Sequence, residues 1–387
     1  MYNKRLIFWS ACLGILFFGM AITTLGSVVP DLRERFGLDD IASGTLFSIL
    51  PFGLLTGSLL FGPLCDRYGY KILLGLACLS MFAGFEGIAY APGRLILQIS
   101  IFFFGLGGGA INGATSALVS DISEKDKGAN LSLLGVFFAI GALGMPFILG
   151  ILKGLFSYQT ILSLIGAATF LVAILYFSIR FPPAKQAGGL FLTKSLYMLR
   201  DKTLLLIAFF LFFQSAFEGI INNWTTTYLT QFLTLEPEKA LYALSLSVVG
   251  MTVMRLLLGS LFRNTAPKFI WTLSFLFIFS GLGFLWMSTS FYGASMGLIL
   301  IGAGLAAGFP IMLGVVGHLY KDLSGTAFSL VFVIALTGNM IINYLMGLIA
   351  QHYGISHLVT VGLAEAFIMA ILCIFILKRK QIIPKKL

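Results

Sequence analysis

The chain has 387 residues, of which 58% are hydrophobic and only 10% are charged, and its formal net charge is +10. Because soluble domains contain about 25% charged residues, this composition excludes a soluble enzyme, a nucleic-acid-binding domain and a disulfide scaffold. The four cysteines have no paired spacing, and no cluster of His, Cys and Asp has the spacing of a metal site or of an activated nucleophile. We therefore expect a membrane protein that is not an enzyme and that needs no metal or cofactor.

Twelve apolar stretches follow one another along the chain, each long enough to cross a hydrocarbon core about 30 Å thick as a helix. The first six predicted spans cover residues 6–29, 41–62, 72–90, 95–118, 129–152 and 160–180. The second six cover residues 203–230, 239–262, 269–287, 293–316, 326–349 and 356–377. Lys4 and Arg5 precede the first span as in a signal peptide, but no small-residue cleavage site follows. The sequence therefore predicts an all-α polytopic membrane protein that keeps its first helix.

The chain also contains an internal repeat with a constant offset of 197 residues, which places Gly62 on Gly259 and Lys71 on Lys268. The same offset aligns further pairs: Gly105 with Gly302, Gly107 with Gly304, Gly128 with Gly325, Ser132 with Ser329, Gly141 with Gly338 and Gly150 with Gly347. One offset held over so long a segment predicts two six-helix bundles, residues 1–180 and 203–387, joined by a cytoplasmic linker, residues 181–202. Because six is even, the bundles are parallel repeats, as in transporters that rock two halves around a central site.

The basic residues predict the orientation of these spans. Loops on the side of the N-terminus hold nineteen Lys and Arg residues, and loops on the opposite side hold only five. The five are Arg33, Arg35, Arg94, Lys153 and Lys239. By the positive-inside rule, we expect both termini in the cytoplasm. The membrane is expected to be the inner membrane of the cell. With acids included, the cytoplasmic loops carry +13, the outer loops −1 and the spans −2, so the net charge needs no nucleic acid to explain it.

A short motif lies between the second and third spans, Gly62-Pro63-Leu64-Cys65-Asp66-Arg67-Tyr68-Gly69-Tyr70-Lys71. Gly62 and Gly69 permit a tight turn, Asp66 can face helix N-terminal dipoles, and Arg67 and Lys71 hold the turn on the basic side. The segment resembles the G-x-x-x-D-R-x-G-x-K/R signature of the major facilitator superfamily. The resemblance implies that the loop latches the two halves together and is released during transport. The alternative is a turn that only sets topology.

A narrower resemblance, to the fucose-permease-like branch, rests on Phe36-Gly37-Leu38, on the segment from Asn112 to Pro146, and on Glu218-Gly219 followed by Trp224 and Tyr228. Members of that branch often move sugars with protons and carry a carboxylate in the middle of the first and fourth spans. This chain has no such acid there. The resemblance therefore implies a sugar-like substrate but leaves the usual proton site unfilled.

A second motif lies in the fifth span, where Gly141, Gly144, Pro146 and Gly150 resemble the glycine-proline motif of drug/proton antiporters. A glycine-rich helix that packs closely and bends at Pro146 is the alternative interpretation.

Four ionisable residues lie inside the predicted spans, where a charge costs at least about 2.5 kcal/mol: Glu86, Glu218, Arg255 and Glu365. Glu218 is the strongest candidate for substrate binding or proton coupling because Gln214 and Asn222, four residues away on each side, share its helical face. A hydrogen-bonded stripe that holds helices together is the alternative. Arg255 can meet a carboxylate or an anionic substrate, or it can snorkel to the cytoplasmic end. Glu86 and Glu365 are expected to reach solvent or to be structural.

Neutral polar residues complete the predicted site. The further candidates are Asn223, Trp224, Asn112, Ser116, Thr24, Asn339 and Asn343. Amides suit a hydroxylated ligand because they both donate and accept, but they also serve as glue between helices, worth about 0.6 kcal/mol each. The resemblance places the first, fourth, seventh and tenth spans around a central cavity.

Together these features predict a monomeric secondary transporter in the lipid bilayer that takes up a small polar organic solute, such as a sugar, together with a coupling proton by alternating access. Proton-driven efflux of drugs or other amphipathic compounds is the alternative. A membrane receptor or scaffold that transports nothing is a third class, and the signature loop and the buried charges argue against it.

Overall fold

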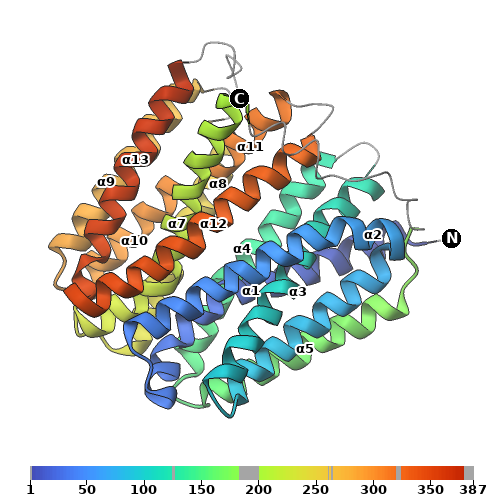
Figure 1. Ribbon diagram of the computed structural model, residues 1–387, viewed down its shortest axis with the longest axis horizontal. Helices are drawn as coiled ribbons and strands as arrows, with labels where there is room; N and C mark the ends of the chain where they lie inside the picture. Colours follow the sequence, from blue (N-terminus) through green and yellow to red (C-terminus); the bar gives the residue numbers. More distant parts are fainter. Residues whose placement is uncertain are drawn as a thin grey trace. The chain divides into compact units, whose positions relative to one another are not determined.

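We describe a computed structural model that covers residues 2–123, 127–182, 200–259, 261–262, 265–319 and 324–378. All regular secondary structure within these residues is helical (Figure 1). The chain divides into two compact units, Met1–Gly189 and Leu190–Leu387. This division falls inside the predicted linker, residues 181–202, most of which lies outside the described residues. Each unit is described separately below.

The described residues of unit 1 form five long helical elements, drawn in blue to green in Figure 1. They are α1 (Lys4–Phe36), α2 (Asp40–Tyr90), α3 (Arg94–Ile122), α4 (Lys127–Leu152) and α5 (Tyr158–Ser178). The element α2 contains both the second and the third predicted spans, Asp40–Phe61 and Tyr68–Tyr90. It packs against α3 and α5, while α1 packs mainly against α4. Five elements therefore supply the six spans predicted for this half.

Unit 2 repeats this plan with its spans in separate helices, apart from one that is divided. Its elements are α7 (Lys202–Gln231), α8 (Pro237–Gly259), α9 (Pro267–Met287), α10 (Phe291–Leu305), α11 (Gly308–Leu319), α12 (Ser324–Tyr353), η2 (Ile355–His357) and α13 (Leu358–Lys378). The helix α7 packs against α12 and α13, and α10 packs against α8 and α9. Twelve segments of the described chain are long and apolar enough to cross a membrane, which agrees with the twelve predicted spans.

The helix ends follow from local capping chemistry. The side chain of Asn3 accepts hydrogen bonds from the backbone N–H groups of Arg5 and Leu6 at the start of α1. At its end, Gly37 adopts a left-handed conformation with φ of 57° and its N–H donates to the carbonyl of Arg33. These caps extend the first helix to Phe36, beyond the predicted end at residue 29. The apolar pattern marks only the part of a helix that lies in lipid, and caps mark its true ends.

The break between the two spans of α2 occurs at Gly69, whose φ of 80° and ψ of 168° belong to a region that is almost restricted to glycine. The next residue, Tyr70, is buried, and its hydroxyl donates a 2.7 Å hydrogen bond to Asp121 at the end of α3. Lys71 is exposed. The predicted turn in the signature loop therefore depends on Gly69. The surroundings of Gly62 and the side chains of Asp66 and Arg67 lie outside what the structure describes, so the latching role of these residues stays a prediction.

Replacing Gly69 with alanine should destabilise the protein by about 1–3 kcal/mol, because a Cβ atom is strained at this φ and ψ. Thermal unfolding of the detergent-solubilised protein measures this change. The matched control is Gly135→Ala in α4, where an added Cβ atom would meet nothing within 4 Å, and we expect no loss there. Equal melting temperatures for the wild type and the Gly69 variant would show that the turn tolerates a side chain.

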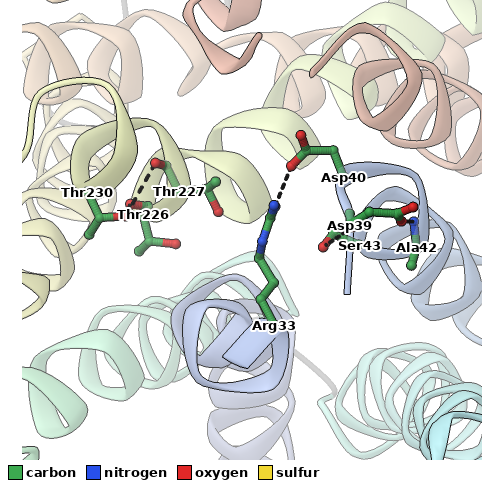
Figure 2. A network of polar contacts seen from close by, with 8 residues as sticks. All are labelled: Arg33, Asp39, Asp40, Ala42, Ser43, Thr226, Thr227 and Thr230. Atoms are coloured by element: carbon green, nitrogen blue, oxygen red, sulfur yellow. Dashed lines mark hydrogen bonds and ion pairs between the residues drawn. The ribbon is translucent and has the colours of Figure 1, made fainter. Parts of the chain in front are cut away.

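All five basic residues of the predicted outer loops have local partners. Figure 2 shows the ion pair of Arg33 with Asp40, beside the cap that Asp39 forms on Ala42. Within unit 1, Arg35 donates to the carbonyls of Ala89 and Ala91 and to the hydroxyl of Tyr158, and Arg94 donates to the carbonyls of Phe36 and Gly37. Lys153 pairs with Asp31 at 3.1 Å, and Lys239 pairs with Glu236 at 3.0 Å. The four cations of unit 1 therefore join helix ends in addition to any role in orientation, whereas the pair of Lys239 with Glu236 is local to the start of α8.

Candidate functional site

The strongest candidate residue, Glu218, lies in the middle of α7 and is half-buried. The side-chain amide of Gln214, one turn earlier, donates a 3.1 Å hydrogen bond to Oε1 of Glu218. The same amide nitrogen donates a 3.0 Å hydrogen bond to the backbone carbonyl of Leu305, the last residue of α10. Gln214 is fully buried, and its Oε1 has no hydrogen-bond partner among the described residues. The amide nitrogen of Gln214 therefore links Glu218 to the end of α10 through two hydrogen bonds. The amide oxygen of Gln214 remains available as an acceptor.

Arg255 of α8 is a cation that attracts the carboxylate of Glu218. Its positive charge interacts with Glu218 across the packed pair α7 and α8. The side chain is half-buried, and its buried Nε has no hydrogen-bond partner within the described part of the chain. The structure thus brings together three of the predicted site residues, namely Gln214, Glu218 and Arg255. This electrostatic interaction does not decide between the two roles weighed for Arg255, so both stay predictions.

The tenth predicted span is divided at this same point. Its first part, α10, ends at Leu305, and α11 begins at Gly308, with Ala306 and Ala307 between them. A Cβ atom on Gly308 would overlap the side-chain amide of Gln214. Glycine is therefore needed here for the amide to approach the break. Discontinuous helices are common at the binding sites of transporters, because their free backbone groups can contact a ligand.

A ladder of amides joins α7 to α12 on the neighbouring face of α7. Nδ2 of Asn223 donates to Oδ1 of Asn343 at 3.0 Å, and Nδ2 of Asn343 donates to Oδ1 of Asn339 at 2.9 Å. Nδ2 of Asn339 then donates to the backbone carbonyl of Ser215 at 2.7 Å. A Cβ atom on Gly219 would lie within 2.7 Å of both the Asn339 and the Asn343 amides. Three predicted site residues, Asn223, Asn339 and Asn343, thus form one chain of hydrogen bonds, whose bonds from Asn223 to Asn343 and from Asn339 to Ser215 cross between α7 and α12.

The remaining candidates of α7 differ in exposure. Asn222 is half-buried, like Glu218 on the same face. Trp224 is fully buried, and Tyr228, one turn later, is also buried and donates to the carbonyl of Leu285 in α9 at 3.3 Å. These two aromatic residues therefore lie in the packed interior of unit 2, which gives their large side chains a packing role.

In unit 1, the candidates form no hydrogen-bonded cluster. Thr24 is fully buried, and its hydroxyl donates to the carbonyl of Met20 in its own helix at 2.8 Å. Thr23, beside it, reaches the carbonyl of Ala142 in α4 at 3.1 Å. On α3, Asn112 is exposed and Ser116 is half-buried. These candidates of unit 1 all have neutral side chains.

The two acids expected to reach solvent or to be structural have different environments. Glu86 of α2 accepts a 2.9 Å hydrogen bond from the hydroxyl of Ser163 in α5, which is a structural contact between helices. Glu365 of α13 is only 3% exposed, which favours the structural alternative over contact with solvent. Burial could not be foreseen for Glu365, because the twelfth span is apolar on all sides and its pattern does not show which face packs inward.

The break in the tenth span was missed by sequence analysis, although a signal for it exists. Gly302, Gly304, Gly308 and Pro310 interrupt an otherwise apolar run, and glycine or proline in such a run is the best sequence indicator of a discontinuous helix. The equivalent stretch of the first half, Gly105 to Gly113, is as rich in glycine but remains continuous within α3. Composition alone therefore did not separate the divided span from the continuous one.

Comparison with known proteins identifies the family. The model of the Major Facilitator Superfamily matches residues 11–337, which is most of the chain. The chain belongs to the major facilitator superfamily. This membership and the twelve apolar helices make it a multi-pass membrane transporter, not an enzyme.

Similar members of the superfamily differ in function. The multi-drug resistance efflux pump PmrA of Streptococcus pneumoniae is 29% identical over 176 residues, which are 43% of this chain and 44% of PmrA. The MFS-type transporter YfkL of Bacillus subtilis, itself uncharacterized, is 22% identical over 88% of both chains. The crystal structure of a D-xylose-proton symporter superposes with a TM-score of 0.80 over 98% of both chains at 15% identity, which shows the same fold. The matched region thus spans less than half of PmrA.

Proposed function

We propose that this protein is a secondary active transporter that takes up a small polar organic solute together with a proton. The observation that carries the proposal is the group formed by Glu218, Gln214 and Arg255 inside the membrane-spanning part of unit 2. A carboxylate in such a position is costly and is retained where it binds substrate or a proton. Arg255 provides a charge that can compete with the proton for Glu218. Loss or gain of that proton would then change the local charge at the end of α10.

The polar character of the site supports a hydroxylated or amide-bearing solute. Within unit 2, Gln214 offers an unused acceptor, and Asn222 offers an amide that is not fully buried. Amides bind neutral hydroxyl groups through both donor and acceptor atoms. The likeness to a D-xylose-proton symporter and the resemblance to the fucose-permease-like branch both favour a sugar within this class.

Efflux of amphipathic compounds is the second candidate, favoured by the similarity to PmrA. The glycine-proline motif of α4 adds little to it. Gly141 lies against the backbone of Leu16 in α1, so a Cβ atom would overlap the Leu16 carbonyl. The smallness of Gly141 is therefore explained by close helix packing, which any function would require.

A ligand screen distinguishes these functions. Purified protein is heated with D-xylose, with 4-hydroxybenzoate as an aromatic carboxylate, or with tetraphenylphosphonium as a lipophilic cation, and the melting temperature is recorded for each. We expect stabilisation by a polar probe, because a ligand that binds only the folded state raises its stability. Glu218→Gln should reduce this shift. Stabilisation by tetraphenylphosphonium alone would favour efflux and reject the uptake proposal.

Several further features belong to this proposal. We propose that the protein is a monomer in the inner membrane with both termini in the cytoplasm. Its two helix bundles comprise residues 1–180 and 203–387, and residues 181–202 link them. The distribution of basic residues supports the orientation. The signature loop around Gly69 would control access during the alternating cycle, and its glycine-dependent turn supports a local change of conformation there.

A further inference from the structure

Glu365 is a second buried acid, and the proposed transport mechanism does not use it. It lies in α13, is 3% exposed, and neither of its carboxylate oxygens has a hydrogen-bond partner within the described residues. This differs from Glu218, which accepts a hydrogen bond from Gln214, and from Glu86, which accepts one from Ser163. Among these three acids of the spans, only Glu365 lacks any partner.

The surroundings of Glu365 are formed by apolar helix faces. The helix α13 packs against α7 and α9. Gly362, one turn before Glu365, lies so close to Phe217 of α7 and Leu282 of α9 that a Cβ atom would meet both side chains. Glu365 lies on the same face of α13 as Gly362 and is itself 3% exposed. This close packing leaves Glu365 in an environment that solvates charge poorly.

No other charge of the neighbouring elements compensates for Glu365. The titratable groups on the elements packed against α13 are Lys202, Glu218 and Tyr228 of α7, Lys268 of α9, Tyr344, His352 and Tyr353 of α12, and His357 of η2. None of them is hydrogen bonded to Glu365. An ionised carboxylate that is buried without a partner is strongly unfavourable, and such a group takes up a proton instead.

We propose that Glu365 is a proton-binding site of unit 2, distinct from the group of Gln214, Glu218 and Arg255. It holds its proton while α13 is packed against α7 and α9, and it releases the proton only when this packing opens. The inference goes beyond the proposed function, because it concerns proton binding by the folded unit and holds for uptake and efflux alike.

Infrared spectroscopy of the purified protein tests the protonation state directly. The difference between the spectra of the wild type and of Glu365→Gln at neutral pH should contain the C=O band of a protonated carboxylic acid. Glu218→Gln, recorded in parallel, distinguishes this band from any contribution of the other acid. A difference spectrum that contains the bands of an ionised carboxylate in place of the acid band would overturn the proposal.

The pH dependence of stability provides a second readout. Because the folded protein keeps the Glu365 proton more firmly than the unfolded chain does, the wild type should lose stability as the pH rises. Glu365→Gln has no proton to lose, so its melting temperature should exceed that of the wild type increasingly at alkaline pH. A difference between the two that stays constant with pH contradicts the proposal.

The matched control for stability is Glu86→Gln, whose acid already has a hydrogen-bonding partner in Ser163. Should Glu365→Gln fail to fold, Glu365→Met removes the polar group altogether and is compared with the wild type in the same two measurements. Failure of the ligand screen leaves both measurements intact, so the two proposals are separable.

Discussion

Replacing Glu218 with glutamine is expected to abolish proton-driven accumulation of the transported solute while leaving the fold intact. The side-chain amide of Gln214 can still donate a hydrogen bond to the side-chain oxygen of a glutamine at position 218. Its hydrogen bond to the carbonyl of Leu305 in α10 is also kept. The variant cannot exchange a proton, however, and cannot present a negative charge to Arg255. We expect the gradient-driven accumulation to fall at least about tenfold, equivalent to about 1.4 kcal/mol.

The measurement uses the ligand found in the thermal screen, with purified protein in liposomes and an inward proton gradient. Exchange of labelled for unlabelled ligand without a gradient is recorded in the same preparation, and it should persist in the variant. Glu86→Gln is the matched control, since Glu86 has a structural contact with Ser163 in unit 1. If Glu218→Gln accumulated the ligand as the wild type does, with the same pH dependence, Glu218 would not be the coupling group.

Replacing Gly219 with valine should have the largest effect on stability. A Cβ atom at this position would lie 2.6 Å from the amide nitrogens of both Asn339 and Asn343. The side chain of valine would therefore push α12 away from α7 and leave buried amides without partners. Overpacking costs about 1–3 kcal/mol, and each buried polar group left unpaired costs a similar amount. We expect a loss of about 3 kcal/mol or more.

Thermal unfolding in detergent measures this loss. The control is Gly283→Ala in α9, where an added Cβ atom would meet nothing within 4 Å, and its melting temperature should stay close to that of the wild type. Asn343→Leu removes the ladder without adding bulk next to Gly219 and should cost less than Gly219→Val. A Gly219 variant as stable as the control would mean that α7 and α12 can separate without penalty.

The fold was predictable from sequence because its main determinants are local. The length and apolarity of each span are read directly from the chain, and the structure confirms all twelve. Helix ends were less accurate, because Asn3 and Gly37 act through hydrogen bonds outside the apolar run.

The candidate site was only partly accessible to sequence analysis. The spacing of Gln214 and Glu218 predicted a shared face, and a hydrogen bond joins them. By contrast, the bond from Gln214 to the carbonyl of Leu305 links residues 91 positions apart and depends on packing that periodicity does not specify. The burial of Glu365 has the same origin, since neighbouring helices alone decide which face of α13 is covered.

The division of the tenth span has a consequence for how the two repeats have diverged. The offset of 197 residues aligns α3 with the tenth span, yet α3 is continuous where its counterpart is divided into α10 and α11. A rod transmits movement along its whole length, whereas a split helix can bend at Ala306 and Ala307 while its two parts stay rigid. The two predicted repeats therefore differ in structure at this position. One half retained a stiff element, and the other has a joint that can bend beside a carboxylate.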